Sequence, residues 1–169
     1  MAYRNKTFVS FASEDITSYR LMQAWKANRH IAFDFHDAHD LNVALDTSQP
    51  ETIRRRLRER LANTKQVVLL VGEKTREVAA ARSRFLHYEV ETIRRLDLPV
   101  VFANLNGYRR VRTDRIPAVL AAQFTLSVSF GPAIIRYALD DYVGRFAAER
   151  ADKKSPRFYL PNVYENLGL

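Results

Sequence analysis

The stretch QVVLLVG, at residues Gln66–Gly72, is an almost continuous apolar run of strand length. A strand that is apolar at every position is typical of a central parallel strand, which helices cover on both faces. The stretch LPVVFAN at Leu98–Asn104 has the same character, and TFVSFA at Thr7–Ala12 is rich in β-branched and aromatic residues. We therefore expect these three stretches to form the middle of a parallel sheet.

Further strands and helices are expected on either side of these three strands. Shorter strands are predicted at Ile31–His36, whose apolar residues alternate, and at Leu126–Phe130. Four helices are predicted between the strands: one from the cap at Ser13 to about Asn28, one from Pro50 through the seam Ile53, Leu57 and Leu61, one over about Arg84–Leu96, and one over Ala133–Ala148.

This alternation predicts a flavodoxin-like α/β fold, a three-layer sandwich with helices on both faces of the sheet. The five-stranded, mainly parallel sheet is expected in the order 2-1-3-4-5. Ligands then bind beyond the carboxyl ends of the strands, where the order reverses between the first and third strands. That rule points to residues 10–13, residues 72–75 and the loop after the second strand. We expect residues 1–149 to form the domain and residues 150–169 to form a C-terminal tail packed on it.

The composition excludes several classes of protein. The 169 residues include no cysteine, which excludes disulfides, thiolate zinc sites and a cysteine nucleophile. No apolar run approaches the ~18 residues of a membrane helix, and no signal-peptide core is visible, so we expect a cytoplasmic protein without membrane contact. The glycine-rich phosphate motifs are absent, and the four histidines form no HExxH pattern, so we expect neither a resident cofactor nor a metal site.

The basic charge admits more than one interpretation. Lysine and arginine outnumber the acids by 27 to 19, a net charge of +8. A polyanionic partner or a plain solvated surface both explain such an excess. For the helix after Pro50 we favour a solvated face first and an assembly surface second. Nucleic-acid binding comes third, because no aromatic residues that could stack on bases are interleaved there. The arginines of this helix are Arg54, Arg55, Arg56, Arg58 and Arg60.

One glutamate lies in an unusual place on the helix expected after the third strand. Phe85, Glu89 and Ile93 recur at i, i+4 and i+8, so Glu89 lies on or beside an apolar stripe, where a charge is costly. Two interpretations remain open: a partly buried glutamate tied to an arginine or a backbone N–H, or a carboxylate that faces a cleft with a shifted pKa. Glu91 points elsewhere and is expected to form an exposed pair with Arg95.

Three motifs, taken in their order and spacing, resemble the TIR and TIR-like family. Phe8-Val9-Ser10-Phe11, followed by an acidic turn, resembles the family's F-x-S-[FY] strand end, and GEKT follows the third strand. FLHYEV, at residues 85–90, resembles the family's W-V-x-x-E-[IV] helix, with phenylalanine in place of tryptophan. The loop FDFHDAHDLNVALDTS resembles the bacterial TIR-like subgroup that includes the TIR component of Thoeris antiphage systems. The resemblance spans about residues 6–147, and only the stretch 76–84 is longer than usual.

The resemblance implies an enzyme that breaks the nicotinamide–ribose bond of NAD⁺. It implies a product, either ADP-ribose-derived or a cyclic ADP-ribose isomer, that signals to a downstream effector protein in antiphage defence. Matched to the family's motif, Glu89 is the catalytic residue, and NAD⁺ is a substrate rather than a cofactor. A homo-oligomer is also implied. The identity of the product, the activating trigger and the oligomeric state are not determined by the sequence.

The resemblance also implies binding residues at three places along the carboxyl edge of the sheet. They are Ser10 and Phe11 at the end of the first strand, Asp37, His39 and Asn42 in the loop after the second, and Thr75 after the third. Each has a structural alternative. Ser10 and Thr75 can cap turns, the loop residues can form Asx turns within their own loop, and Phe11 can belong to the core.

Two other functions compete with the enzyme. A catalytically inert TIR-like adaptor would act by homotypic assembly alone, and turnover of NAD⁺ by the purified protein separates it from the enzyme. A basic nucleic-acid-binding domain is the third possibility, which a salt-dependent oligonucleotide shift tests.

Overall fold

The fold is built on one parallel sheet. The computed structural model describes residues 4–33, 36–37, 49–152 and 155–169. Within this part of the chain the strands lie in the order β2-β1-β3-β4-β5-β6, and every neighbouring pair is parallel. The strands are β1 (Lys6–Ser10), β2 (His36–Asp37), β3 (Gln66–Val71), β4 (Val100–Asn104), β5 (Leu126–Ser129) and β6 (Arg157–Phe158).

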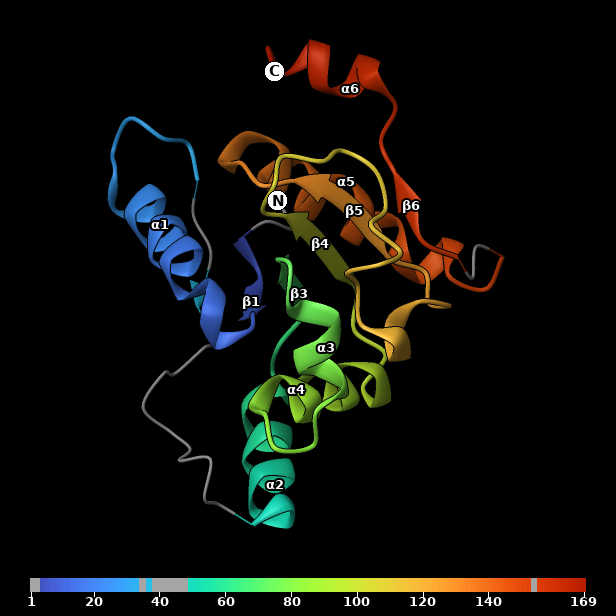
Figure 1. Cartoon of the computed structure of the whole chain (residues 1–169). Helices are drawn as coiled ribbons and strands as arrows, with labels where there is room; N and C mark the ends of the chain where they lie inside the picture. Colours follow the sequence, from blue (N-terminus) through green and yellow to red (C-terminus); the bar gives the residue numbers. More distant parts are fainter. Residues whose placement is uncertain (1–3, 34–35, 38–48, 153–154) are drawn as a thin grey trace.

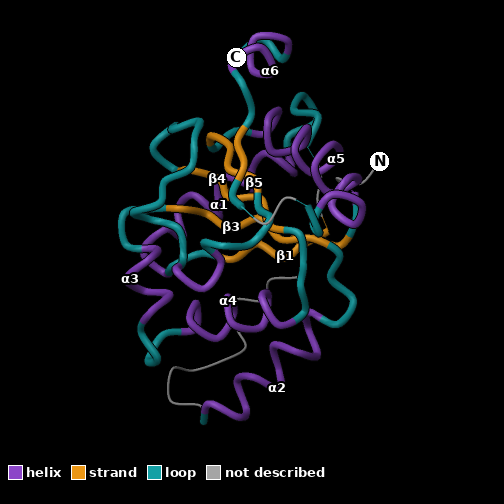
Figure 2. Tube along the Cα trace, turned by 90° about the vertical axis from the view of Figure 1, so that its right-hand side faces the viewer, coloured by secondary structure: helices purple, strands orange, loops and turns teal. Residues whose placement is uncertain are grey.

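Helices cover both faces of the sheet, as Figures 1 and 2 show. One layer holds α1 (Ile16–Ala27), α5 (Pro132–Glu149) and α6 (Pro161–Asn166). The other holds α3 (Thr75–Ala80) and α4 (Phe85–Arg95), with α2 (Pro50–Leu61) packed against α4 from outside. Two short 3₁₀ helices cover Ser13–Asp15 and Ala118–Leu120. The predicted three-layer α/β sandwich is confirmed.

The central strands explain why the core has two halves. All residues of β3 and β4 are buried, as their continuous apolar runs predicted. Successive side chains of a strand point to opposite faces, so Val68 and Leu70 join the core beside α1 and α5, whereas Val67 and Leu69 join the core beside α4. Each fully buried side chain of this size contributes about 1.5–3 kcal/mol relative to an exposed one.

The predicted strand order 2-1-3-4-5 is confirmed, but the second strand is shorter than the range Ile31–His36. Only His36–Asp37 pairs with β1, and residues 31–33 are irregular. Local hydrogen bonds explain the difference: the Asn28 side chain accepts the His30 N–H at 2.9 Å, and the Phe33 N–H donates to the Ile31 carbonyl at 2.8 Å. Phe33 is buried in an edge-to-face contact with Trp25, so its apolar character serves packing rather than a strand.

The C-terminal segment contains regular structure that the sequence did not predict. Arg157 and Phe158 pair with Leu126 and Ser127, which adds β6 to the sheet, and α6 buries Tyr164 completely. The segment therefore packs on the body of the protein through a strand and a helix rather than as a purely extended tail. The proposed boundary at residue 149 stays a prediction.

Among the described residues, no helix has both the length and the apolar character needed to cross a bilayer.

Candidate active site at the end of the first strand

The central feature of the site is a hydrogen bond between the first strand and α4. Ser10, the last residue of β1, is fully buried, and its Oγ donates to Glu89 Oε2 at 2.6 Å. Phe8 and Ala12 lie in the core on the α4 side of the sheet, and by strand alternation Ser10 points the same way. Glu89 follows the first turn of α4 and is only 6% exposed. The expected position of Glu89 on the buried face of its helix is confirmed.

The surroundings of Glu89 shift its ionisation towards neutral pH. Removal from water raises the pKa of the Glu89 carboxyl to about 7, because burial disfavours the charged form. The hydrogen bond from Ser10 and the positive charge of Arg60 on α2 act in the opposite direction and favour the carboxylate. A carboxyl that changes charge near pH 7, at the carboxyl edge of a parallel sheet, is characteristic of functional sites.

A second, more exposed bridge lies beside the first. Arg84, the residue before α4, donates to Ser13 Oγ at 2.7 Å and to the Glu14 carboxylate at 2.8 and 2.9 Å. This guanidinium lowers the pKa of Glu14. The bond between Ser10 and Glu89 joins β1 to α4, and this bridge joins the 3₁₀ helix after β1 to the residue that precedes α4.

Two other predicted site residues have structural roles. Thr75 is fully buried, and its Oγ accepts the Gly72 N–H at 2.8 Å and donates to the Leu70 carbonyl at 3.4 Å, so its hydroxyl closes the turn after β3. Phe11 lies on the opposite face of the sheet from Ser10, stacked on Tyr19 with 4.7 Å between ring centroids. The structure therefore brings Ser10 to Glu89, but it places Phe11 in the core and uses the Thr75 hydroxyl as a turn cap.

The remaining predicted residues follow the second strand. Asp37 pairs with Thr7, the second residue of β1, and so lies beside the start of that strand, three residues before Ser10. His39 and Asn42 lie outside the described residues. Their proposed contact with the substrate stays a prediction.

Comparison with known families shows which family this architecture belongs to. A family model described as "Thoeris protein ThsB, TIR-like domain" matches residues 8–110, more than half of the chain. The chain belongs to the ThsB TIR-like family. The matched range includes Ser10, Glu89, the end of β1 and the strands β2 to β4, so the resemblance drawn from the sequence is confirmed. The protein is therefore a TIR-type antiphage defence protein.

The TIR domain has one further acidic residue at this edge, which lies in the acidic turn after Phe11 and was not predicted as a site residue. Asp15 precedes α1, but its side chain makes no capping hydrogen bond. Its carboxylate lies against Gly72, where an added Cβ would be 2.5 Å from both oxygens, and its Oδ2 is buried with no hydrogen-bond partner in the described part of the chain. Burial, followed by the charges of Glu14 and Glu73, raises the Asp15 pKa. Two features of the sequence could have indicated this contact: the acidic turn that holds Asp15, and Gly72 directly after β3.

Glu91, the second glutamate of α4, lies in different surroundings from Glu89. It forms the expected pair with Arg95, at 3.6 Å between nitrogen and oxygen, and also contacts Arg54 of α2 at 3.3 Å. Its side chain is 34% exposed, whereas Glu89 is buried against β1. The two glutamates therefore face different neighbours, and only Glu89 reaches the carboxyl edge of the sheet.

Proposed function

We propose that this TIR domain cleaves NAD⁺ at the bond between nicotinamide and ribose. The observation that carries the proposal is the buried carboxyl of Glu89, hydrogen-bonded to Ser10 at the carboxyl edge of β1 with a pKa of about 7. The carbon–nitrogen bond breaks with its electron pair passing to the cationic ring, so nicotinamide leaves as a neutral molecule and needs no general acid. NAD⁺ is the substrate, and no resident cofactor is invoked.

A single carboxylate is sufficient for this chemistry. Departure of nicotinamide leaves positive charge on the ribose, and a carboxylate in a water-poor site stabilises that charge strongly. Water then adds to the anomeric carbon and gives ADP-ribose, or a nucleophile within the same molecule adds and gives a cyclic isomer. Ser10 acts as a positioning residue, because its hydroxyl fixes one oxygen of Glu89 and favours the ionised form.

The proposal is tested by incubating the purified protein with NAD⁺ and separating the products by mass. Cleavage gives nicotinamide together with ADP-ribose, or with a product lighter than ADP-ribose by one water when the ring closes. Either nucleotide could serve a separate effector protein as a signal.

The rate of cleavage should depend on pH through Glu89. The residue acts as a carboxylate, and its pKa is raised to about 7, so turnover should rise from about pH 5.5 and level off above about pH 8. The measurement is the initial rate of NAD⁺ loss over that range, with circular dichroism at each pH as a control for folding. A rate that falls as pH rises through 7 would mean that the protonated form of Glu89 is the active one.

The burial of Glu89 predicts that a dilute single chain has little activity. Glu89 is 6% exposed and one of its carboxyl oxygens is bonded to Ser10, so a substrate needs β1 and α4 to separate at this point. We propose that homotypic assembly, typical of TIR domains, stabilises the open arrangement. Turnover should then rise more than linearly with protein concentration. Strictly proportional rates over a hundredfold range, in protein that light scattering shows to be monomeric, would contradict this expectation.

The burial of Glu89 also supports the alternative function. A TIR-like adaptor that acts by assembly alone needs no accessible carboxylate, and the fully engaged Thr75 hydroxyl and the core position of Phe11 agree with that view. The absence of nicotinamide release from protein that is shown to be assembled would favour the adaptor.

A further inference from the structure

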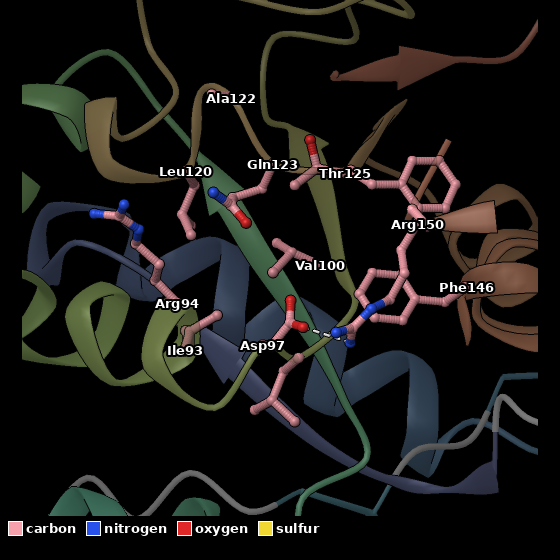
Figure 3. Close-up of a pocket in the computed structure, with 13 residues that line it drawn as sticks. Ile93, Arg94, Asp97, Val100, Leu120, Ala122, Gln123, Thr125, Phe146 and Arg150 are labelled. Atoms are coloured by element: carbon pink, nitrogen blue, oxygen red, sulfur yellow. Dashed lines mark ion pairs between the residues drawn. The ribbon is translucent and has the colours of Figure 1, made fainter. Parts of the chain in front are cut away.

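A cavity of about 470 Å³ lies at the opposite edge of the sheet from Glu89. It borders Val100, the first residue of β4, and Thr125, which directly precedes β5, so it opens at the amino ends of these strands. In Figure 3, Ile93 and Arg94 of α4 lie on one side of the cavity, and Phe146 of α5 lies on the other. The volume falls within the ~300–1,000 Å³ of small-molecule sites.

The frame of the cavity is held firmly. Asp97 ends the turn after α4 with a positive φ of 53° and forms an ion pair with Arg150, just beyond α5 (Figure 3). The Tyr142 hydroxyl donates to the Phe124 carbonyl at 2.7 Å and accepts the Val100 N–H at 3.3 Å. These contacts connect the C-terminal parts of α4 and α5 with the starts of β4 and β5, which together surround the cavity.

The polar groups that line the cavity favour an anion. Arg94 is exposed and has no ion pair within the described part of the chain, whereas Arg150 is balanced by Asp97. Gln123 also lines the cavity and offers an amide, and in Figure 3 the Leu120 side chain lies between it and Arg94. The lining therefore carries one surplus positive charge together with the amide of Gln123.

The helix ends leave this preference for an anion intact. Backbone amides already occupy the last carbonyls of α4, through Leu96 to Thr92 and Leu98 to Ile93, and an amide also occupies the Phe146 carbonyl of α5. Their negative ends are thus partly neutralised towards the cavity.

The remaining lining is apolar and includes an aromatic ring. Leu98, Val100, Leu120, Phe124 and Phe146 form this part of the wall. We propose that the cavity binds a small organic anion that carries a ring, of the nucleoside monophosphate class. Its phosphate would lie against Arg94 and Gln123, and its base against the apolar wall near Phe146. Guanidinium groups bind phosphate through paired N–H donors, which favours arginine for this task. The proposal does not depend on cleavage of NAD⁺.

Isothermal titration calorimetry of the full chain with AMP tests this site. We expect AMP to bind, and adenosine and inorganic phosphate each to bind at least about tenfold more weakly, because each lacks one half of the recognised chemistry. Arg94→Ala should weaken AMP binding by about tenfold or more, since a charge-assisted hydrogen bond is lost. Arg95→Ala is the matched control, because this neighbouring arginine pairs with Glu91 and does not line the cavity. It should leave AMP affinity within about twofold of the parent value.

Three results would overturn the proposal. The first is no heat of binding with AMP at millimolar concentration, and the second is equal affinity in the parent and Arg94→Ala proteins. The third is loss of AMP binding in Glu89→Gln, which would place the nucleotide at the other edge of the sheet. Retained binding in Glu89→Gln, together with loss in Arg94→Ala, assigns the ligand to this cavity whatever the protein does to NAD⁺.

Discussion

Glu89→Gln should reduce the turnover of NAD⁺ by about 10²–10³-fold, the usual cost of removing one electrostatic contact with a transition state. Glutamine keeps the size of the side chain and can still accept the hydrogen bond from Ser10 at the end of β1. It lacks the negative charge that would stabilise the ribose cation. The measurement is NAD⁺ consumption by parent and variant at about pH 8, where the parent carboxyl is ionised.

The same substitution should make the folded protein more stable at that pH. The Glu89 pKa is about 7 in the folded protein, against 4.5 for an unperturbed glutamate, so the folded state holds a proton that the unfolded state has released between these pH values. The parent free energy of unfolding therefore falls as pH rises from about 4.5 to about 7, by about 3 kcal/mol for a shift of this size. Glutamine avoids that loss. Denaturation should show the variant to be the more stable protein at pH 8, with a difference that shrinks below about pH 5.

Glu91→Gln is the matched control on the same helix. Glu91 contacts Arg54 and Arg95 at the surface, and exposed ion pairs of this kind contribute at most about 1 kcal/mol to stability. Turnover should stay within about twofold of the parent rate, because the substitution leaves the bond between Ser10 and Glu89 in place. Loss of activity in Glu91→Gln with retention in Glu89→Gln would contradict the assignment of the catalytic carboxylate.

Tyr164→Ala should destabilise the protein by about 3–5 kcal/mol, the cost of deleting a large buried aromatic side chain. Tyr164 is fully buried, its hydroxyl accepts the Ser129 N–H at 3.1 Å, and the Arg109 guanidinium lies 4.3 Å from the ring centroid. This residue anchors α6 to the end of β5, beyond the range that the family model matches. Urea denaturation followed by circular dichroism measures the change.

Two controls separate burial from other effects of changing the C-terminal segment. Tyr164→Phe removes only the hydroxyl and should cost about 1 kcal/mol, the net value of one hydrogen bond. Leu160→Ala changes a residue that is 64% exposed and should alter stability by no more than about 0.5 kcal/mol. A Tyr164→Ala protein as stable as Leu160→Ala would mean that the segment after residue 149 is not part of the folding unit.

The sequence predicted the fold where a single signal decided the local structure. A continuous apolar run of strand length, as in β3 and β4, predicts a buried parallel strand. The spacing of Phe85, Glu89 and Ile93 predicts a helix with these residues on one face. Two strands lacked such a signal. Residues 31–33 are apolar because Phe33 packs on Trp25, and β6 has only two residues, both exposed, so its pairing with β5 depends on the finished sheet.

The site was predictable only in part for a related reason. Helical periodicity placed Glu89 on the buried face, but the Ser10 hydroxyl that meets it is 79 residues away in the chain. The bridge from Arg84 to Glu14 spans 70 residues and follows no local pattern. The packing of Asp15 against Gly72 is equally non-local. Motif matching named Thr75 and Phe11 from their positions in the chain, and it could not show that a turn and the core already use them.

The most direct test of the central proposal is nicotinamide release from NAD⁺ at about pH 8, by protein concentrated enough to assemble. Chromatography should show many molecules of nicotinamide per protein chain from the parent and almost none from Glu89→Gln. No nicotinamide from an assembled, folded parent protein would contradict the proposed cleavage and leave assembly as the function of this TIR domain.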